Sequence, residues 1–260
     1  MEYTNQVGGR AKITKVLDDH LLKPTTVNEV NNYMCLPRLV AEVAPDICFV
    51  VSLEDIIPLK MCNACSNSFH SIQDLMQARP KGYYLIMKDA AHDLQKPRLM
   101  DLKLGTRTYS DYITEERKQH HIRKALRNTT SRLGVRMCGA SFHGATEGKI
   151  IKWSKAWGKE MSSEEFSMAM KAFFNVSEPQ KRDTILQLRK IKTALESCPG
   201  FRFFGASLLA VLDDLDGKTV IIKMIDFASM ARSELGQPQY EGPDDGALFG
   251  VNNMLSILED

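Results

Sequence analysis

A serine and an aspartate near the carboxyl end of the chain are candidates for a metal or phosphate site. Ser207 and Asp226 lie at the outer ends of two apolar runs that are separated by Asp216-Gly217. An Asp-Gly pair between such runs predicts a tight hairpin, because a type I′ turn needs positive φ at both central residues. A two-residue turn would set Ser207 opposite Asp226, and a hydroxyl beside a carboxylate suits a hard cation or a phosphate. The alternative is that both side chains emerge into solvent where the strands end.

A second candidate is the basic segment 114–127, which reads TEERKQHHIRKALR and contains five Lys or Arg and two His. Helical spacing gathers its cationic side chains on two neighbouring faces, with Arg117, His121 and Lys124 on one and His120, Arg123 and Arg127 on the next. Converging cations of this kind bind phosphate groups. A helix this polar is also typical of a solvated surface, and its composition alone leaves both interpretations open.

Cys62 and Cys65 are spaced like a pair of zinc ligands, because thiolates separated by two residues can share one metal. His70 follows nearby, but no second ligand pair at zinc-site spacing does. We therefore expect the six cysteines to be reduced thiols, with neither a disulfide framework nor a zinc site. Residues 58–80, which contain this pair, have no readable helix or strand pattern.

The composition is that of an ordinary globular protein, with 43% hydrophobic and 25% charged residues in a chain of 260. The 34 Lys and Arg nearly balance the 32 Asp and Glu, so we expect no nucleic-acid partner, and any anion site must be local. No apolar run approaches the roughly 18 residues of a membrane span, and the first residues lack the apolar core of a signal peptide. We expect a monomer without a membrane span that works in the cytosol or nucleus.

The elements that would position these residues form two groups on either side of a polar connector. Before it, the patterns predict strands at about 11–17, 21–24, 47–53 and 82–87 and a helix at about 27–34. After it, they predict a strand at about 98–104, the hairpin, and helices at about 114–127, 162–174 and 178–197. The second of these helices begins at a capping box formed by Ser162 and Glu165. The connector, residues 88–96, is the predicted hinge between an N-terminal lobe, residues 1–96, and a C-terminal lobe, residues 97–260.

Residues 97–105, PRLMDLKLG, resemble the P-x-x-x-D-x-K-x-G signature of the inositol polyphosphate kinase family. Two more segments follow in the family's order: FGASLL at 204–209 resembles its S-S-L-L segment, and IDF at 225–227 resembles its metal motif. Further segments are most similar to inositol hexakisphosphate kinases, namely 6–9, 133–139, 157–159, 241–246 and 249–250. Two positions depart from the pattern: Ala206 stands where the family has a serine, and Lys88 where it usually has a glutamate.

This resemblance implies an α+β, two-lobed, protein-kinase-like fold with an ATP site between the lobes and no Walker A loop. Lys23 would reach the ATP phosphates, and Glu29 would hold that lysine in place. The main chain around Lys88 and Ala90 would pair with adenine. Asp101 would bind the ribose hydroxyls.

The resemblance also implies a metal and a transfer site. Asp226, with help from Ser207, would hold Mg²⁺ against the ATP phosphates. Lys103 lies two residues beyond Asp101 on the same strand, so it points to the same face and would bridge the transferred phosphoryl group and the acceptor. Lys103 and Asp226 are therefore the expected catalytic residues.

The acceptor site implied by the family consists of a helical segment at about 106–131 and a strip at about 150–162. Its expected basic residues are Lys103, Arg107, Arg117, His120, His121, Lys124, Arg127, Lys155 and Lys159. The implied reaction transfers the γ-phosphoryl group of Mg-ATP to inositol hexakisphosphate and forms a diphosphoinositol. One alternative is a multikinase that phosphorylates ring hydroxyls of inositol tris- and tetrakisphosphates. A less favoured alternative is a non-catalytic inositol phosphate sensor, because the nucleotide and metal residues are all present.

Overall fold

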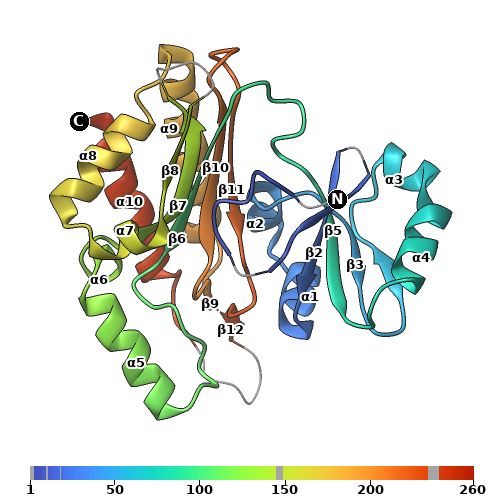
Figure 1. Ribbon diagram of the computed structural model, residues 1–260. Helices are drawn as coiled ribbons and strands as arrows, with labels where there is room; N and C mark the ends of the chain where they lie inside the picture. Colours follow the sequence, from blue (N-terminus) through green and yellow to red (C-terminus); the bar gives the residue numbers. More distant parts are fainter. Residues whose placement is uncertain (1–2, 10, 18, 145–148, 234–239) are drawn as a thin grey trace.

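Two antiparallel five-stranded sheets lie on either side of the connector (Figure 1). The connector begins one residue later than predicted, at residue 89, because Lys88 is the last residue of a strand. The structure is a computed structural model, and it describes residues 3–9, 11–17, 19–144, 149–233 and 240–260. In this part of the chain no helix is both long and apolar enough to cross a membrane.

The first sheet has the strand order β1 (Thr14–Leu17), β2 (His20–Thr25), β5 (Tyr83–Lys88), β3 (Ile47–Val51) and β4 (Ile56–Pro58). Helices α1 (Val27–Met34) and α2 (Arg38–Val43) lie between this sheet and the second one, whereas α3 (Asn63–Asn67) and α4 (Phe69–Gln77) cover its outer face (Figure 1). Side chains alternate across β2: Leu21 joins the large core that both sheets share, and Leu22 joins a small core under α3 and α4. Residues 58–80, for which the sequence predicted no helix or strand, contain these two short helices.

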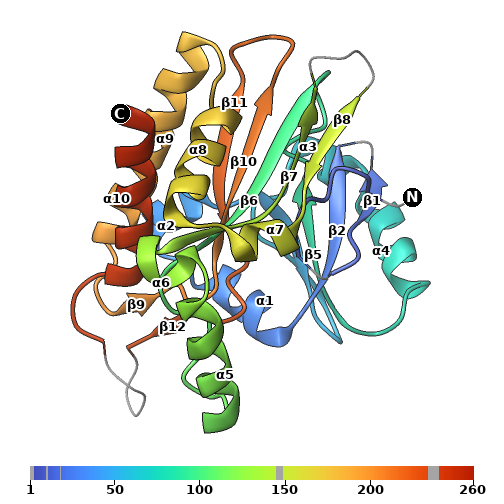
Figure 2. The same cartoon turned by 60° about the vertical axis from the view of Figure 1, so that its left-hand side comes forward.

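The second sheet has the strand order β11 (Val220–Ile225), β10 (Ser207–Asp213), β6 (Pro97–Leu104), β7 (Val135–His143) and β8 (Ile150–Trp153). Figure 2 shows α8 (Ser163–Phe173), α9 (Glu178–Glu196) and α10 (Asp245–Glu259) over one face of this sheet. The predicted capping box at Ser162 and Glu165 is confirmed, and Phe166, Met170 and Phe173 are buried as the helical spacing indicated. The opposite face of the second sheet lies towards the first lobe and the connector.

Shorter elements complete the second lobe. A strand pair joins β9 (Phe201–Arg202) and β12 (Ala231–Arg232). Helix α5 (Glu115–Leu126) projects from the body of the lobe and is followed by α6 (Thr129–Leu133), and α7 (Lys155–Glu160) follows β8 (Figures 1 and 2).

The β10–β11 hairpin differs from its prediction by one residue. Ser207 pairs with Ile225 on one side and with Lys103 of β6 on the other, so Ser207 is not opposite Asp226. The cause lies in the loop: Asp216 Oδ1 accepts hydrogen bonds from the main-chain N–H groups of Lys218 (2.7 Å) and Thr219 (2.9 Å). This Asx-type turn needs a longer loop than a two-residue type I′ turn, and the longer loop shifts the strand register.

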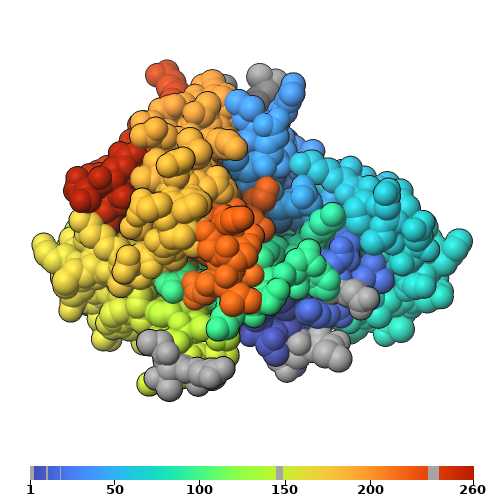
Figure 3. Space-filling view, turned by 90° about the horizontal axis from the view of Figure 1, so that it is seen from above, coloured from blue at the N-terminus to red at the C-terminus, as the bar shows by residue number. Residues whose placement is uncertain are grey.

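Two sets of contacts fix the arrangement of the lobes, one beside Asp226 and one at the carboxyl end of the connector. Asn32 of α1 donates a hydrogen bond to Phe227 O (2.7 Å), directly after Asp226, and the rings of Tyr33 and Phe227 meet edge to face. At the other end, the Asp213 carboxylate accepts from the N–H groups of Gln95 and Lys96, both at 3.0 Å. Figure 3 shows the connector in green against the orange β10–β11 hairpin. The predicted hinge is thus tied to the second lobe by its main chain.

Candidate active site

Lys23 forms the centre of a partly buried ion-pair network between the lobes. Its Nζ lies 2.9 Å from Glu29 Oε1 and 2.7 Å from Asp226 Oδ1, and its side chain is 14% exposed. Thr25 donates a hydrogen bond to the second Glu29 oxygen, so the carboxylate is fixed at the start of α1. Burial opposes the charge of Lys23, but the carboxylates of Asp226 and Glu29 outweigh it and raise the pKa of the amine. The structure therefore brings together three of the residues predicted for the nucleotide and metal site.

Asp226 follows the last residue of β11 in a left-handed backbone conformation. Its φ is 66°, and no other non-glycine residue in the described ranges has a positive φ. Aspartate tolerates this region better than most residues, and such strain clusters at functional sites. Burial would raise its pKa, but Lys23 and Lys103, whose Nζ lies 3.8 Å from Oδ2, lower it below the ordinary value. Asp226 is therefore an ionised carboxylate and suits a hard cation.

Lys103 and Asp101 share one face of β6, as predicted. Lys103 donates a hydrogen bond to Gly205 O (2.5 Å), which aims its amine towards the end of β10. Asp101 is 4% exposed, and burial raises its pKa although Lys103 lowers it. Asp101 Oδ1 and the Ser207 hydroxyl are both buried, and neither forms a hydrogen bond of normal geometry within the described residues, although Ser207 lies close enough to Asp101 to help lower its pKa. Buried polar atoms left in this state suit a ligand that supplies hydroxyl donors or a cation.

Gly8 has a role that the sequence analysis missed. A Cβ on this residue would lie 1.8 Å from Asp101 Oδ2, so the main chain of the N-terminal segment packs directly on the Asp101 carboxylate. Only glycine allows this approach. The sequence carried a signal in Gly8-Gly9, but nothing in it indicated that Asp101 was the contact.

The connector offers an apolar surface for an adenine ring. Ala91, Leu99 and Val211 form a buried cluster on the same sheet face as Asp101, with further apolar side chains packed around it, among them Ala90. The N–H of Lys88 donates to Asp46 O (3.1 Å), so this donor is engaged within the first lobe. Main-chain pairing with adenine around Lys88 and Ala90 stays a prediction.

Arg136 is a site residue that the motif analysis did not single out. It lies on β7 directly opposite Lys103, it is 5% exposed, and its Nε and Nη1 have no hydrogen-bond partner in the described part of the chain. A buried guanidinium with two unsatisfied nitrogens is costly, so this part of β7 suits an anion bound beside Lys103. Lys155, at the start of α7, acts on both carboxylates: its charge opposes the burial that raises the pKa of Asp101, and it adds to the effect of Lys23 and Lys103, which lower the pKa of Asp226 against burial. The role of Lys155 as an acceptor residue stays a prediction.

Helix α5 meets its predicted description as an exposed basic helix. None of its residues is buried. His121 lies 3.1 Å from the Thr108 hydroxyl, and burial, followed by the charges of Lys124, His120 and Arg117, lowers the pKa of its imidazole. The cations of this helix therefore repel one another, and a bound polyanion would reduce that repulsion.

Three other predicted acceptor residues differ in their surroundings. Arg107 is paired with Asp111 and lies over the rings of Tyr109 and Phe204, so its charge is already balanced within the protein. Arg127 is the C-cap of α5, and Lys159 is an exposed residue of α7.

A model of the family described as inositol polyphosphate kinase matches residues 84–259. Inositol hexakisphosphate kinase 3 from Mus musculus is 28% identical over 199 residues, which cover 68% of this chain and 50% of that protein. Inositol hexakisphosphate kinase 1 from Mus musculus is 26% identical over 220 residues, which cover 68% of this chain and 51% of that protein. The chain thus spans about half the length of the curated relatives it matches.

A solved structure shares the architecture of most of the chain. The crystal structure of an inositol phosphate multikinase from S. cerevisiae, in complex with ADP and Mn²⁺, has a TM-score of 0.70 at 18% identity. The match covers 93% of this chain and 98% of that one. This likeness confirms the expected α+β, two-lobed, kinase-like fold.

Proposed function

Because the chain belongs to the inositol polyphosphate kinase family, we propose that it transfers the γ-phosphoryl group of Mg-ATP to inositol hexakisphosphate and forms a diphosphoinositol. One observation carries the proposal: the partly buried group of Lys23, Asp226 and Lys103 lies beside Arg136, whose buried Nε and Nη1 have no hydrogen-bond partner among the described residues. These charges would bind the phosphates of ATP on one side of Lys103 and the phosphates of the acceptor on the other. The matched curated relatives, which are inositol hexakisphosphate kinases, support this acceptor.

On the nucleotide side, Lys23 binds the ATP phosphates while Glu29 holds its amine in position. The unpartnered Asp101 Oδ1 accepts a hydrogen bond from a ribose hydroxyl. The apolar cluster around Leu99 and Val211 packs against the adenine ring, with the main chain of Ala90 at its edge.

The Asp226 carboxylate and the buried Ser207 hydroxyl are the oxygen donors that would hold Mg²⁺. When bound, this ion neutralises charge on the β- and γ-phosphates. The chain's own part is to keep Asp226 ionised, which Lys23 and Lys103 do by lowering its pKa.

The acceptor oxygen belongs to a phosphate of inositol hexakisphosphate and is already ionised at neutral pH, so no base has to remove a proton. This oxygen forms a bond to the γ-phosphorus, and the bond from that phosphorus to the bridging oxygen of ADP breaks. Lys103 stabilises the charge of the transferred group, while Arg136 and Lys155 hold the acceptor. Positioning and charge neutralisation supply most of the rate.

The second candidate function is phosphorylation of ring hydroxyls in inositol tris- or tetrakisphosphates. The overall likeness to the inositol phosphate multikinase favours it. A neutral hydroxyl acceptor requires a base or strong positioning. Asp226 is poorly suited to be that base, because its two lysine partners stabilise the ionised form and lower its pKa.

The deciding experiment is incubation with Mg-ATP and a panel of inositol tris-, tetrakis- and hexakisphosphates, with products separated by charge. The proposal expects inositol hexakisphosphate to be converted to a more highly charged product. Phosphorylation of the tris- and tetrakisphosphates alone would establish the multikinase alternative. Binding without turnover of any acceptor would indicate a sensor.

The role of α5 is tested by replacing Arg117, Lys124 and Arg127 together with Gln. The KM for inositol hexakisphosphate should rise more than the KM for an inositol trisphosphate, because the more charged ligand depends on more contacts. Affinity for ATP should hardly change. The matched control neutralises three exposed cations of α9, namely Lys181, Arg182 and Lys190. An unchanged ratio of the two KM values in a folded triple variant means that α5 is a solvated surface, and Lys155 and Lys159 become the next residues to test.

A further inference from the structure

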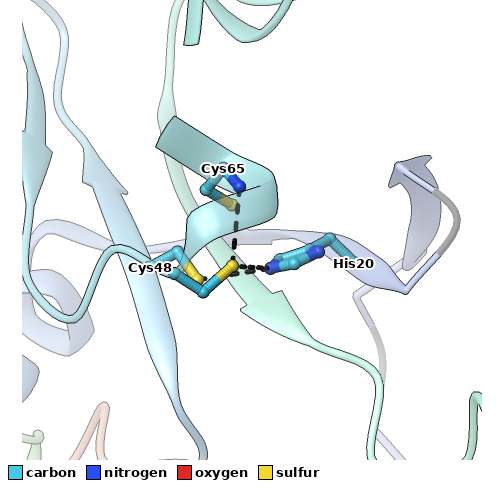
Figure 4. A group of neighbouring side chains, drawn as sticks. His20, Cys48 and Cys65 are labelled. Carbon is cyan, nitrogen blue, oxygen red and sulfur yellow. Dashed lines mark hydrogen bonds between the residues drawn. The ribbon is translucent and has the colours of Figure 1, made fainter. Parts of the chain in front are cut away.

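Four potential metal ligands converge on the outer face of the first sheet, away from the active site. His20 Nε2 lies 3.3 Å from Cys48 Sγ and 3.4 Å from Cys62 Sγ. Together with Cys65, their ligand atoms all lie within 4.8 Å of one another. Figure 4 shows the side chains of His20, Cys48 and Cys65 pointing towards a common centre.

Separate parts of the first lobe supply these ligands. His20 is the first residue of β2, and Cys62 and Cys65 lie at the start of α3, where Cys62 is the N-cap. Cys48 is the extra residue of a β-bulge in β3, because Ile47 and Phe49 oppose the adjacent residues Met87 and Ile86 of β5. Bulges re-aim side chains, and this one places Cys48 in the small outer core rather than in the core shared by the lobes.

The second ring nitrogen of His20 is also engaged. Its Nδ1 lies 2.6 Å from Asp19 Oδ1, and the imidazole is fully buried. A carboxylate at Nδ1 favours the tautomer that donates from Nδ1, which leaves the Nε2 lone pair facing the sulfur atoms. Histidines that bind metals are typically oriented by a carboxylate in this way.

We propose that His20, Cys48, Cys62 and Cys65 bind one structural Zn²⁺. Zinc–sulfur and zinc–nitrogen bonds of about 2.3 and 2.0 Å in a tetrahedron give ligand–ligand separations of about 3.5–3.8 Å. The His20–sulfur distances of 3.3 and 3.4 Å are close to these values. Three thiolates and one imidazole form a closed ligand set of the structural type, and soft sulfur ligands select zinc over magnesium or calcium.

The proposed site fastens α3 and α4 to the sheet that carries Lys23. The outer core under these helices is small, and small cores need additional cross-links. His20 and Lys23 lie on opposite faces of β2, three residues apart, so the metal would brace the strand from behind while Lys23 points to the active site.

Spacing along the chain does not reveal this ligand set. No second ligand pair follows Cys65, and the other two ligands of the proposed site precede Cys62 and lie on two different strands. His70, the neighbour that the sequence offered, is exposed and is not among the converging ligands.

The test begins with the untagged full chain, purified without chelators and analysed for metals by inductively coupled plasma mass spectrometry. The proposal expects about one zinc per chain. Cys48→Ser and Cys65→Ser should each lose at least nine-tenths of it. Cys35→Ser and Cys198→Ser, which change cysteines outside the cluster, should retain it.

Loss of zinc in a misfolded variant would prove nothing, so a second measurement uses the wild type. Zinc is removed under reducing conditions and CoCl₂ is added alone. One equivalent of Co²⁺ should produce the intense visible bands of a tetrahedral thiolate complex, and added zinc should abolish them.

A wild-type chain that contains no zinc and gives no such cobalt spectrum would overturn the proposal. So would full zinc content in the folded Cys48→Ser and Cys65→Ser variants, or a disulfide among these cysteines in the protein as isolated. Each of these measurements is independent of kinase turnover, so the site and the proposed function can fail separately.

Discussion

Replacing Asp226 with Asn tests the active site most sharply, because it removes one charge and little else. Asn shares with Asp a tolerance of the left-handed region, so the φ of 66° at this position should be retained. The amide still offers an oxygen to Lys23, but it is a much weaker ligand for a hard cation than a carboxylate. Asp226→Ala is the matched control, since it adds the backbone cost of a positive φ to the loss of charge.

The expected effects on stability and on turnover differ greatly in size. Breaking a buried ion pair by removing one partner costs about 3–5 kcal/mol. Lys23 retains Glu29 at 2.9 Å, and Asn keeps a neutral acceptor, so we expect a smaller loss of about 1–2 kcal/mol in the free energy of unfolding. Turnover should fall about a thousandfold, equivalent to roughly 4 kcal/mol in the activation free energy.

The assay combines turnover of Mg-ATP and acceptor with urea unfolding followed at several pH values. Asp226 has a folded pKa below its ordinary value, so its contribution to stability is present above pH about 4 and is lost as the pH falls through the lower folded pKa. Asp226→Asn should therefore weaken the loss of stability in acid. Turnover within about threefold of the wild type would refute the assignment of Asp226 to the metal site.

Three further predictions concern the residues around this site. Lys103→Ala should lower kcat by about 10²–10³ with a smaller effect on ATP affinity, because charge on the transferred group develops most in the transition state; a change confined to the KM for ATP would count against this role. Gly8→Ala should raise the KM for ATP, because its Cβ would lie 1.8 Å from Asp101 Oδ2, whereas Gly82→Ala meets only ordinary contacts of 3.4 Å and should have little effect; equal kinetics in the two variants would contradict the contact. The pKa of His121, lowered by burial and by neighbouring cations, should rise when inositol hexakisphosphate binds, as measured by NMR titration, and an unmoved pKa would place the ligand elsewhere.

Short-range patterns predicted much of this protein correctly. The helix at residues 27–34 was predicted with the bounds of α1, and the predicted helix at 178–197 differs from α9 by one residue. These predictions rest on caps, helical periodicity and the Pro-Gly stop, which are properties of neighbouring residues. Asp101, Lys103 and Asp226 could also be chosen from the sequence, because each belongs to a short signature, whereas Lys23 was expected only from the family resemblance.

Contacts between distant segments could not be derived in this way. The register that pairs Ser207 with Ile225 depends on the hydrogen bonds that the Asp216 side chain accepts from the main chain of the loop. A shift of one residue changes which side chain lies opposite Ser207. Arg136 became a site residue only when β7 placed it beside Lys103, with no hydrogen-bond partner for its Nε and Nη1 in the described part of the chain.

The sequence by itself determined the family, several of the helices and strands, and the residues available for phosphoryl transfer, because local patterns carry that information. Only the tertiary structure decided which distant side chains meet. His20, Cys48, Cys62 and Cys65 come together because a bulge in β3 and the start of α3 converge behind β2. Such contacts depend on sheet order, bulges and loop lengths, which act between residues far apart in the chain, and no spacing within one segment encodes them.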